Sequence, residues 1–295
     1  MSVWNTIQAQ MQETLQQPVT LSAPQGVGGG SINQSCRVSS GADSWFVKLN
    51  RAGLLDMFVA EAKGLEALSA APGLRIPRAL CYGEDGSQAW LVLEYLELGG
   101  AGDPVALAEG LAALHRISAP QYGWQRDNTI GSTPQINTCE DDWATFWREH
   151  RLGFQLQLAA RNGASAAALD SGEQLMDRLP QLFDGREPEV SLLHGDLWSG
   201  NYAYTRTGQP TIFDPAVYFG DREADLAMTE LFGGFSRDFY AAYQNAWPLD
   251  AGYALRKTLY NLYHVLNHFN LFGGGYLSQA QGMMQRLLSE VRGQV

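Results

Sequence analysis

The chain has 295 residues, of which 45% are hydrophobic and 17% are charged, and its formal net charge is −11. This composition allows a sizeable core and argues against global disorder. The acidic balance argues against nucleic acid and membranes as partners, because both attract basic surfaces. No apolar run approaches the roughly 20 residues that span a bilayer, and residues 1–17 are too polar for a secretory signal. Three cysteines without CxxC spacing are typical of reduced thiols, so we expect a cytoplasmic protein.

The first third of the chain alternates between helix and strand patterns. Apolar residues at helical spacing predict helices over residues 2–16 and 54–70. Strict alternation over residues 44–49 and a mostly apolar run over residues 89–95 predict strands. Between the first helix and the first strand, the glycine-rich residues 26–30 interrupt regular structure.

A glycine cluster over residues 99–102 follows and is a candidate hinge. Beyond it the chain is mainly helical, with one short β-rich segment over residues 190–213. This segregation of strands and helices indicates an α+β fold. We therefore predict a small, β-rich N-terminal lobe over residues 1–96 and a larger, mainly helical C-terminal lobe over residues 97–295. The helical patterns of the second lobe cover residues 104–117, 141–161 and 255–272.

Two carboxylates and one amide stand at the ends of short predicted strands. Asp196 and Asn201 belong to one turn-rich segment, and Asp214 follows a predicted strand over residues 211–213. Asp-x4-Asn followed by a separate Asp is the pattern with which kinases supply a general base and two Mg²⁺ ligands. Oxygen ligands are those that Mg²⁺ prefers. The pattern therefore predicts Asp196 as the base and Asn201 and Asp214 as the metal ligands.

A structural interpretation of the same segment stays open. Asp and Asn side chains often cap turns, so Asp196 and Asn201 could serve the backbone alone. We interpret the neighbouring His194 as a hydrogen-bonded structural residue behind the loop rather than a catalytic group.

The N-terminal half supplies the parts that would bind a nucleotide. In kinases, a strand lysine reaches the α- and β-phosphates and pairs with a helix glutamate, which predicts these roles for Lys48 and Glu61. The alternatives are an exposed edge-strand lysine and a solvated glutamate. Glycine backbone near the first strand could approach phosphates closely, although no Walker A lysine follows it. The residues of this candidate phosphate loop are Gly28, Gly29, Gly30 and Ser31.

The apolar strand that ends near residue 96 would lead into the hinge. Backbone groups near Glu94 and Leu96 could then hydrogen-bond adenine. An ordinary core strand explains the hydrophobicity equally well, and only the position of the strand suggests a nucleotide contact.

Several segments together resemble the fructosamine kinase (ketosamine kinase) family, and within it the bacterial branch. The Trp-Ser-Gly after Asp196 is more specific than the general kinase pattern. The resemblance covers nearly the whole chain and is carried by Gly28-Gly-Gly-Ser-Ile32, Phe46-Val-Lys-Leu-Asn50, Gly131-Ser-Thr-Pro-Gln135, His194-Gly-Asp-Leu-Trp-Ser-Gly-Asn201, Ile212-Phe-Asp-Pro-Ala216 and Gly220-Asp-Arg-Glu223.

This resemblance implies a two-lobed protein-kinase-like fold and an ATP- and Mg²⁺-dependent enzyme. It implies phosphorylation of the 3-hydroxyl of ketosamines, which are ribulosamine, erythrulosamine or fructosamine adducts of amines or lysine side chains. Breakdown of the phosphorylated adduct would amount to deglycation and protein repair. The resemblance also implies that Trp198 forms an aromatic wall for the sugar, whereas a core tryptophan is the alternative.

Other functions remain open on the sequence alone. Aminoglycoside or choline kinase-like enzymes share the Asp-x4-Asn pattern, and an acidic pocket would also suit their cationic substrates. An inactive nucleotide-binding protein is a further alternative. A Ser/Thr protein kinase is disfavoured, because no Ala-Pro-Glu segment follows Asp214. We expect a monomer; a weak dimer linked through Cys36 is the alternative to a strand thiol there.

Overall fold

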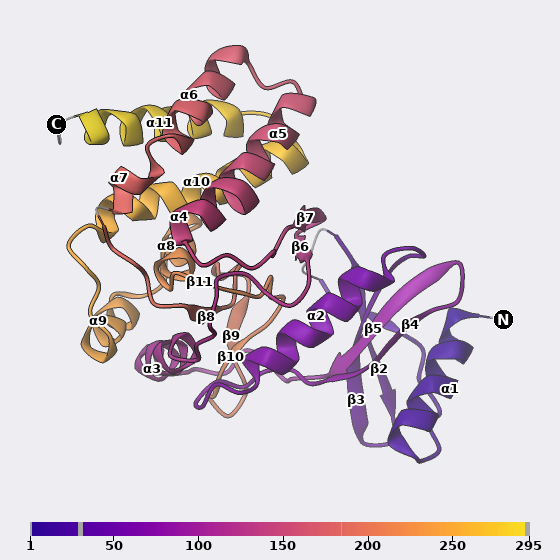
Figure 1. Cartoon of the computed structure of the whole chain (residues 1–295). Coiled ribbons are helices and arrows are strands. Elements are labelled where there is room, and N and C mark those ends of the chain that lie inside the picture. Colours follow the sequence, from indigo (N-terminus) through magenta and orange to yellow (C-terminus); the bar gives the residue numbers. More distant parts are fainter. Residues whose placement is uncertain (1, 29–31, 184, 293–295) are drawn as a thin grey trace.

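The computed structural model describes residues 2–28, 32–183 and 185–292, which form a small sheet-containing part and a larger helical part (Figure 1). In the described residues, no helix is long and apolar enough to cross a membrane. The elements, in chain order, are α1 (Val3–Leu15), β1 (Gln25–Gly26), β2 (Gln34–Ser40), β3 (Asp43–Arg51), α2 (Leu55–Leu68), β4 (Ala79–Glu84), β5 (Gln88–Glu94), α3 (Pro104–His115), β6 (Asn128–Ile130), β7 (Thr133–Gln135), α4 (Trp143–Phe146), the π-helix η1 (Trp147–Gly153), α5 (Phe154–Arg161), α6 (Ala166–Met176), α7 (Leu179–Phe183), β8 (Ser191–Leu193), β9 (Tyr202–Tyr204), β10 (Pro210–Ile212), β11 (Tyr218–Gly220), α8 (Glu223–Leu231), α9 (Arg237–Ala246), α10 (Tyr253–Phe272) and α11 (Tyr276–Arg292).

The N-terminal part is a five-stranded antiparallel sheet in the order β1-β2-β3-β5-β4. Successive side chains of β3 point to opposite faces of the sheet, and other parts of the protein cover both faces. Trp45, Val47 and Leu49 belong to one buried cluster with Ile7 and Met11 of α1. The opposite face of the sheet is turned toward α2 and the helical part (Figure 1).

The second buried cluster crosses from the sheet into the helical part without interruption. Leu91 and Leu93 of β5 belong to it together with Phe58 and Leu65 of α2 and with the helices of the C-terminal part. Because this cluster is continuous, α2 packs against the sheet and against the helical part. The position of the lobe boundary after residue 96 therefore remains a prediction, because the core does not divide there.

Helix α2 packs closely on the segment that follows Asp214. A Cβ atom at Gly64 would lie 3.1 Å from Val217 Cγ2 and 3.4 Å from Pro215 Cγ. Only glycine lets the helix backbone approach the 215–217 segment this closely without displacing it. Glu61 stands on the same helix, one turn earlier.

The predicted hinge residues lie against β9. The Gly99 N–H donates to the carbonyl oxygen of Tyr204 at 3.0 Å, and Leu98 forms an isolated bridge with Thr205. A second link joins the two parts, because the Arg75 N–H donates to the carbonyl oxygen of Pro210 at 2.8 Å.

The β-rich segment predicted over residues 190–213 contains three strands, one of which pairs outside that range. Strand β9 pairs with β10, but β8 pairs with β11, which lies outside that range. The two pairings place the loop between β8 and β9 beside the loop between β10 and β11. Asp196 and Asn201 stand in or at the end of the first loop, and Asp214 stands in the second.

Candidate active site

A cavity of about 600 Å³ lies between the sheet with α2 on one side and the two loops with α10 on the other. Its lining includes six of the side chains that the sequence singles out. The six are Lys48, Glu61, Asp196, Trp198, Asn201 and Asp214. The groups therefore share one cavity, whereas their individual roles remain predictions.

Lys48 holds together residues that are far apart in the sequence. Its Nζ donates to Glu61 Oε1 and to Asp214 Oδ1, each at 2.6 Å. Burial acts to lower the pKa of Lys48, but the two carboxylates outweigh it and raise that pKa, so the side chain stays an ammonium. The alternative of an exposed edge-strand lysine is wrong, because β3 is an inner strand and Lys48 is only 4% exposed.

Asp214 has an unusual backbone. Its φ angle is +57°, in the left-handed region that residues other than glycine rarely adopt. One carboxylate oxygen accepts from Lys48, and no hydrogen bond to the described residues engages the other, Oδ2. The side chain is 44% exposed, so this second oxygen is available to a ligand in the cavity.

Asp196 and Asn201 contact each other within the loop between β8 and β9, which is the candidate catalytic loop. The Asn201 amide nitrogen donates to the main-chain oxygen of Asp196 at 2.8 Å and to its Oδ2 at 3.3 Å. Burial and the nearby Asp214 carboxylate raise the pKa of Asp196 to about 7. A carboxylate of this basicity suits the role of a general base near neutral pH.

The cavity also offers oxygens that fit a divalent cation. Within the described part of the chain, neither Asn201 Oδ1 nor Asp214 Oδ2 accepts a hydrogen bond. The same part contains no cluster of three or more His, Cys, Asp or Glu side chains that could hold a metal. One amide and one carboxylate fit Mg²⁺, which typically takes few protein ligands and completes its shell with phosphate and water oxygens.

A set of buried residues, to which the sequence patterns assigned no role, lies behind the loop. Asp225 of α8 accepts the backbone N–H groups of His194 at 2.7 Å and Gly195 at 2.8 Å. Although burial acts to raise it, contacts with His115 and with these amides hold the pKa of Asp225 below its usual range. His115 Nε2 lies 3.1 Å from the same carboxylate. Asp225 thus fixes the backbone that carries Asp196.

Gly195 and His194 are two residues of this loop that are suited to its close packing. Gly195 has a φ of +83°, and a Cβ there would lie 2.0 Å from the carbonyl oxygen of Ala216. His194 is fully buried, and its Nε2 lies 2.9 Å from the carbonyl oxygen of Phe213. This confirms the interpretation of His194 as a structural residue behind the loop.

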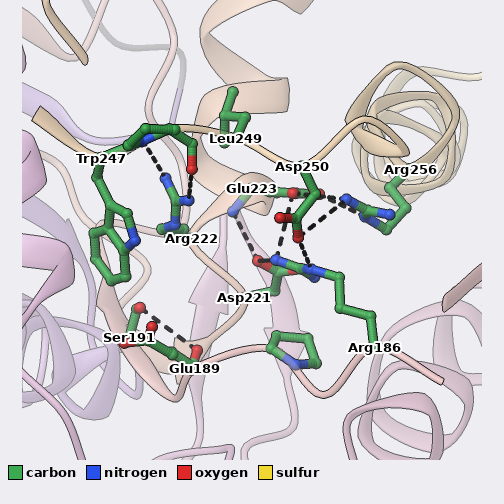
Figure 2. A network of polar contacts seen from close by, with 12 residues as sticks. Arg186, Glu189, Ser191, Asp221, Arg222, Glu223, Trp247, Leu249, Asp250 and Arg256 are labelled. Carbon is green, nitrogen blue, oxygen red and sulfur yellow. Dashed lines mark hydrogen bonds and ion pairs between the residues drawn. The ribbon is translucent and has the colours of Figure 1, made fainter. Parts of the chain in front are cut away.

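An ion-pair network fixes α8 from the other side (Figure 2). Arg256 Nε and Nη2 donate to the two carboxylate oxygens of Glu223 at 2.7 and 2.8 Å. Arg186 lies between Asp221 and Asp250 and contacts both. The network ties the N-terminus of α8 to α10, and so supports the helix on which Asp225 stands.

Not all predicted nucleotide contacts reach the cavity. Gly28, Glu94 and Leu96 are not among its lining residues. The Glu94 carboxylate pairs with Arg75, whereas the N–H of Leu96 makes no hydrogen bond to the described residues. Gly29, Gly30 and Ser31 lie outside the described residues. The roles assigned to these residues in binding ATP remain predictions.

Trp198 lies at the edge of the cavity. It is 37% exposed, so the alternative of a core tryptophan is wrong. Its ring packs edge-on against Phe232, with 6.4 Å between the ring centroids. Trp198 thus lines the cavity, and its role as an aromatic wall for a sugar remains a prediction.

A sheet packed beside a helical part, a buried lysine between a glutamate and an aspartate, and an Asp-x4-Asn loop define a phosphotransferase of the protein-kinase-like fold. The family model described as "Fructosamine kinase" matches residues 3–290. The chain therefore belongs to the fructosamine kinase family, which confirms the resemblance inferred from the sequence.

Relatives of known name agree with this assignment. A protein of Synechocystis sp. named "Probable ketoamine kinase" is 50% identical over 288 residues, which cover 97% of both chains. The chloroplastic protein-ribulosamine 3-kinase of Arabidopsis thaliana is 43% identical over 266 residues, which cover 89% of this chain and 81% of the relative.

Solved structures confirm the predicted fold class. A crystal structure described as that of a "Putative fructosamine-3-kinase" from Haemophilus somnus 129PT matches with a TM-score of 0.89 at 28% identity, covering 97% of both chains. An aminoglycoside phosphotransferase matches with a TM-score of 0.63 at 16% identity, covering 98% of this chain and 99% of the other. The second match concerns the fold alone.

Proposed function

We propose that this protein is an ATP-dependent kinase that phosphorylates the 3-hydroxyl of ketosamines. The acceptors are ribulosamine, erythrulosamine or fructosamine adducts of amines or lysine side chains, and the outcome is deglycation. One observation carries the proposal: Asp196, Asn201, Asp214 and Lys48 line the same cavity as the exposed ring of Trp198. The family membership and the names of the relatives support the substrate class.

The residues of the cavity divide the chemistry between them. Lys48, oriented by Glu61 at 2.6 Å, binds the nucleotide phosphates through its ammonium. Asp196 accepts the proton of the 3-hydroxyl while that oxygen forms its bond to the γ-phosphorus. The bond from this phosphorus to the bridging oxygen breaks, and ADP leaves.

Asn201 and Asp214 would hold Mg²⁺ through Oδ1 and Oδ2, the oxygens without hydrogen bonds in the described part of the chain. The ion would neutralise charge on the transferred phosphate. The Lys48 ammonium lies 2.6 Å from Asp214 Oδ1 and orients this carboxylate, which leaves Oδ2 for the ion.

The test is an assay of ADP formation with ribulose-, erythrulose- and fructose-lysine as acceptors. We expect turnover with at least one of them and a loss on the order of 10² or more with Asp196→Asn. Aminoglycosides and choline, tested in parallel, address the rival substrate class, which the fold match alone keeps open. Turnover of aminoglycosides but of no ketosamine would overturn the proposal.

We propose further that the protein acts in the cytoplasm as a monomer. Cys36 supports this view, because its side chain is 4% exposed within the core beside α1, and burial raises the pKa of its thiol. A buried, protonated thiol is a poor partner for a disulfide between two chains.

A further inference from the structure

The lining of the active-site cavity runs from an exposed mouth to a buried floor. Phe272 is 58% exposed and Trp198 is 37% exposed, whereas His264 is 5% and Asn267 is 2% exposed. His264 and Asn267 stand on α10, and Met228 of α8 lies beside them in the lining. The floor therefore consists of buried lining residues from α8 and α10 together with Asn128 of β6.

His264 is the one polar side chain of this floor without a hydrogen bond in the described part of the chain. Asn267 is occupied, since it donates to the carbonyl oxygen of Ile130 and accepts from Gln155. Asn128 is also occupied, since its amide donates to the carbonyl oxygen of Val217 at 2.8 Å and its Oδ1 accepts from Gln135 and Asn137. No hydrogen bond to the described residues engages the imidazole nitrogens of His264, whereas its backbone carbonyl, besides its place in the helix, faces His268 Nδ1 at 2.8 Å.

The imidazole of His264 is uncharged. Burial lowers its pKa to about 3, so at neutral pH one ring nitrogen carries a proton and the other a free lone pair. Such a ring can both donate to and accept from a hydroxyl group. A buried polar group of this kind costs free energy unless a ligand or water pairs with it.

The size of the acceptor fixes its direction in the cavity. A lysine on a protein surface is attached to a body far larger than about 600 Å³, so the amine end must stay at the mouth. The sugar then enters with its hydroxylated tail first. The carbons beyond the phosphorylated position consequently point toward the floor.

We propose that His264 is a specificity-determining residue, whose imidazole hydrogen-bonds a hydroxyl on the sugar tail beyond carbon 4. This inference rests on the proposed function and adds which end of the acceptor is recognised and by which side chain. A tail that reaches the floor gains this hydrogen bond, and a shorter tail leaves the imidazole unpaired. The enzyme therefore favours acceptors of five or more carbons over those of four.

The experiment compares ribulose-lysine with erythrulose-lysine, which lacks the carbon-5 hydroxymethyl group. Wild type is expected to have the higher kcat/KM for ribulose-lysine. His264→Leu is expected to reduce the ratio of the two kcat/KM values about tenfold, mainly through ribulose-lysine, because one hydrogen bond is lost. His264→Asn, which keeps a donor and an acceptor, is expected to retain part of the preference.

Two controls separate recognition from damage to the fold. Leu271→Met changes another lining side chain without touching a polar group and is expected to leave the ratio unchanged. The thermal shift with Mg²⁺ and ATP reports on the intact nucleotide site in every variant. An equal loss for both acceptors in His264→Leu, or a ratio equal to that of wild type, would overturn the inference while leaving the kinase assignment intact. Failure of wild type to phosphorylate any of ribulose-, erythrulose- and fructose-lysine would instead overturn the proposed function and the inference with it.

Discussion

Asp196 combines a proposed catalytic role with a cost to the stability of the fold. Its carboxyl has a raised pKa because it is partly buried and lies near the Asp214 carboxylate. Between the ordinary aspartate pKa near 4 and about 7, the folded protein binds more protons than the unfolded chain. Stability contributed by this group is therefore present at low pH and is lost as the pH rises through that window.

Asp196→Asn should remove this pH dependence. In nucleotide- and metal-free protein we expect the variant to match wild type in thermal midpoint near pH 4.5, and to exceed it by a few degrees at pH 8. Differential scanning fluorimetry across this range measures the effect. A difference that shrinks as the pH rises would contradict the assignment of the raised pKa to Asp196.

Arg151 is a second residue whose contribution to stability follows from its burial. It is fully buried and pairs with no carboxylate among the described residues, but donates to the carbonyl oxygen of Ile136 at 2.6 Å and to Asn137 Oδ1 at 2.8 Å. Its guanidinium also lies 4.1 Å from the centroid of the Tyr218 ring. The planar cation thus joins the η1 helix to the segment after β7.

Arg151→Met should lower the free energy of unfolding by about 3 kcal/mol, because two buried acceptors lose their donor. Arg151→Lys should recover little of the loss, since an ammonium cannot reproduce the planar set of donors. Urea denaturation gives both values. A loss below about 1 kcal/mol for the Met variant would show that water replaces the guanidinium.

The sequence pattern identified the residues that face the cavity better than those that hold them. Asp196, Asn201 and Asp214 follow a spacing that phosphoryl transfer requires, so local sequence was sufficient to find them. Asp225 and His115 contact each other over 110 positions. Such contacts depend on how distant helices pack, and no local pattern encodes them.

At the scale of elements, the position of α2 decides how the site is assembled. The helix bears Glu61 and rests on Pro215 and Val217 at Gly64. The contact at Gly64 therefore couples the Lys48–Glu61 pair to the loop that carries Asp214.

Gly64→Val should push α2 away from this loop and cost about 1–3 kcal/mol of stability, as overpacking of a core usually does. The KM for ATP should rise several-fold, because Glu61 moves with the helix. Val217→Ala in the same chain should restore part of both losses by vacating the space. Lys63→Val is the matched control, since Lys63 is half exposed on the same helix; an equal effect there would point to helix propensity instead of packing.

Elements with strong periodicity were predicted nearly to the residue. The helix predicted over 54–70 is α2, and the one over 255–272 is α10. The helix predicted over 141–161 exists but contains the π-helix η1, because an apolar pattern does not reveal how many residues each turn holds. The pairing of β8 with β11 escaped prediction for a related reason: three-residue strands carry too few alternations to specify a partner.

At the scale of the whole molecule, the nucleotide site joins the sheet to the helical part. Mg²⁺ and ATP together should therefore raise the thermal midpoint, with a stabilisation of about 2.7 kcal/mol at a ligand concentration 100 times Kd. ATP with a chelator should give a smaller shift, and Asp214→Asn should abolish the difference between the two conditions. An identical shift with and without Mg²⁺ would exclude Asn201 and Asp214 as metal ligands.

The oligomeric state can be tested in the same preparation. We expect a single monomer band on non-reducing electrophoresis, in wild type and in Cys36→Ser alike, because the Cys36 thiol is buried in the N-terminal core. A dimer band that disappears in the variant would contradict this expectation.

The close packing of α2 at Gly64 has a consequence for how the enzyme's activity can be regulated. An enzyme of this fold could be switched off by swinging the glutamate-bearing helix outward, and such a movement needs a gap into which the helix can settle and from which it returns. Here the helix backbone already touches the loop behind it at Gly64, and its apolar face belongs to a core shared by both parts of the chain. The close packing at Gly64 therefore opposes an outward movement of α2, and we expect the Lys48–Glu61 pair to persist in the ligand-free protein.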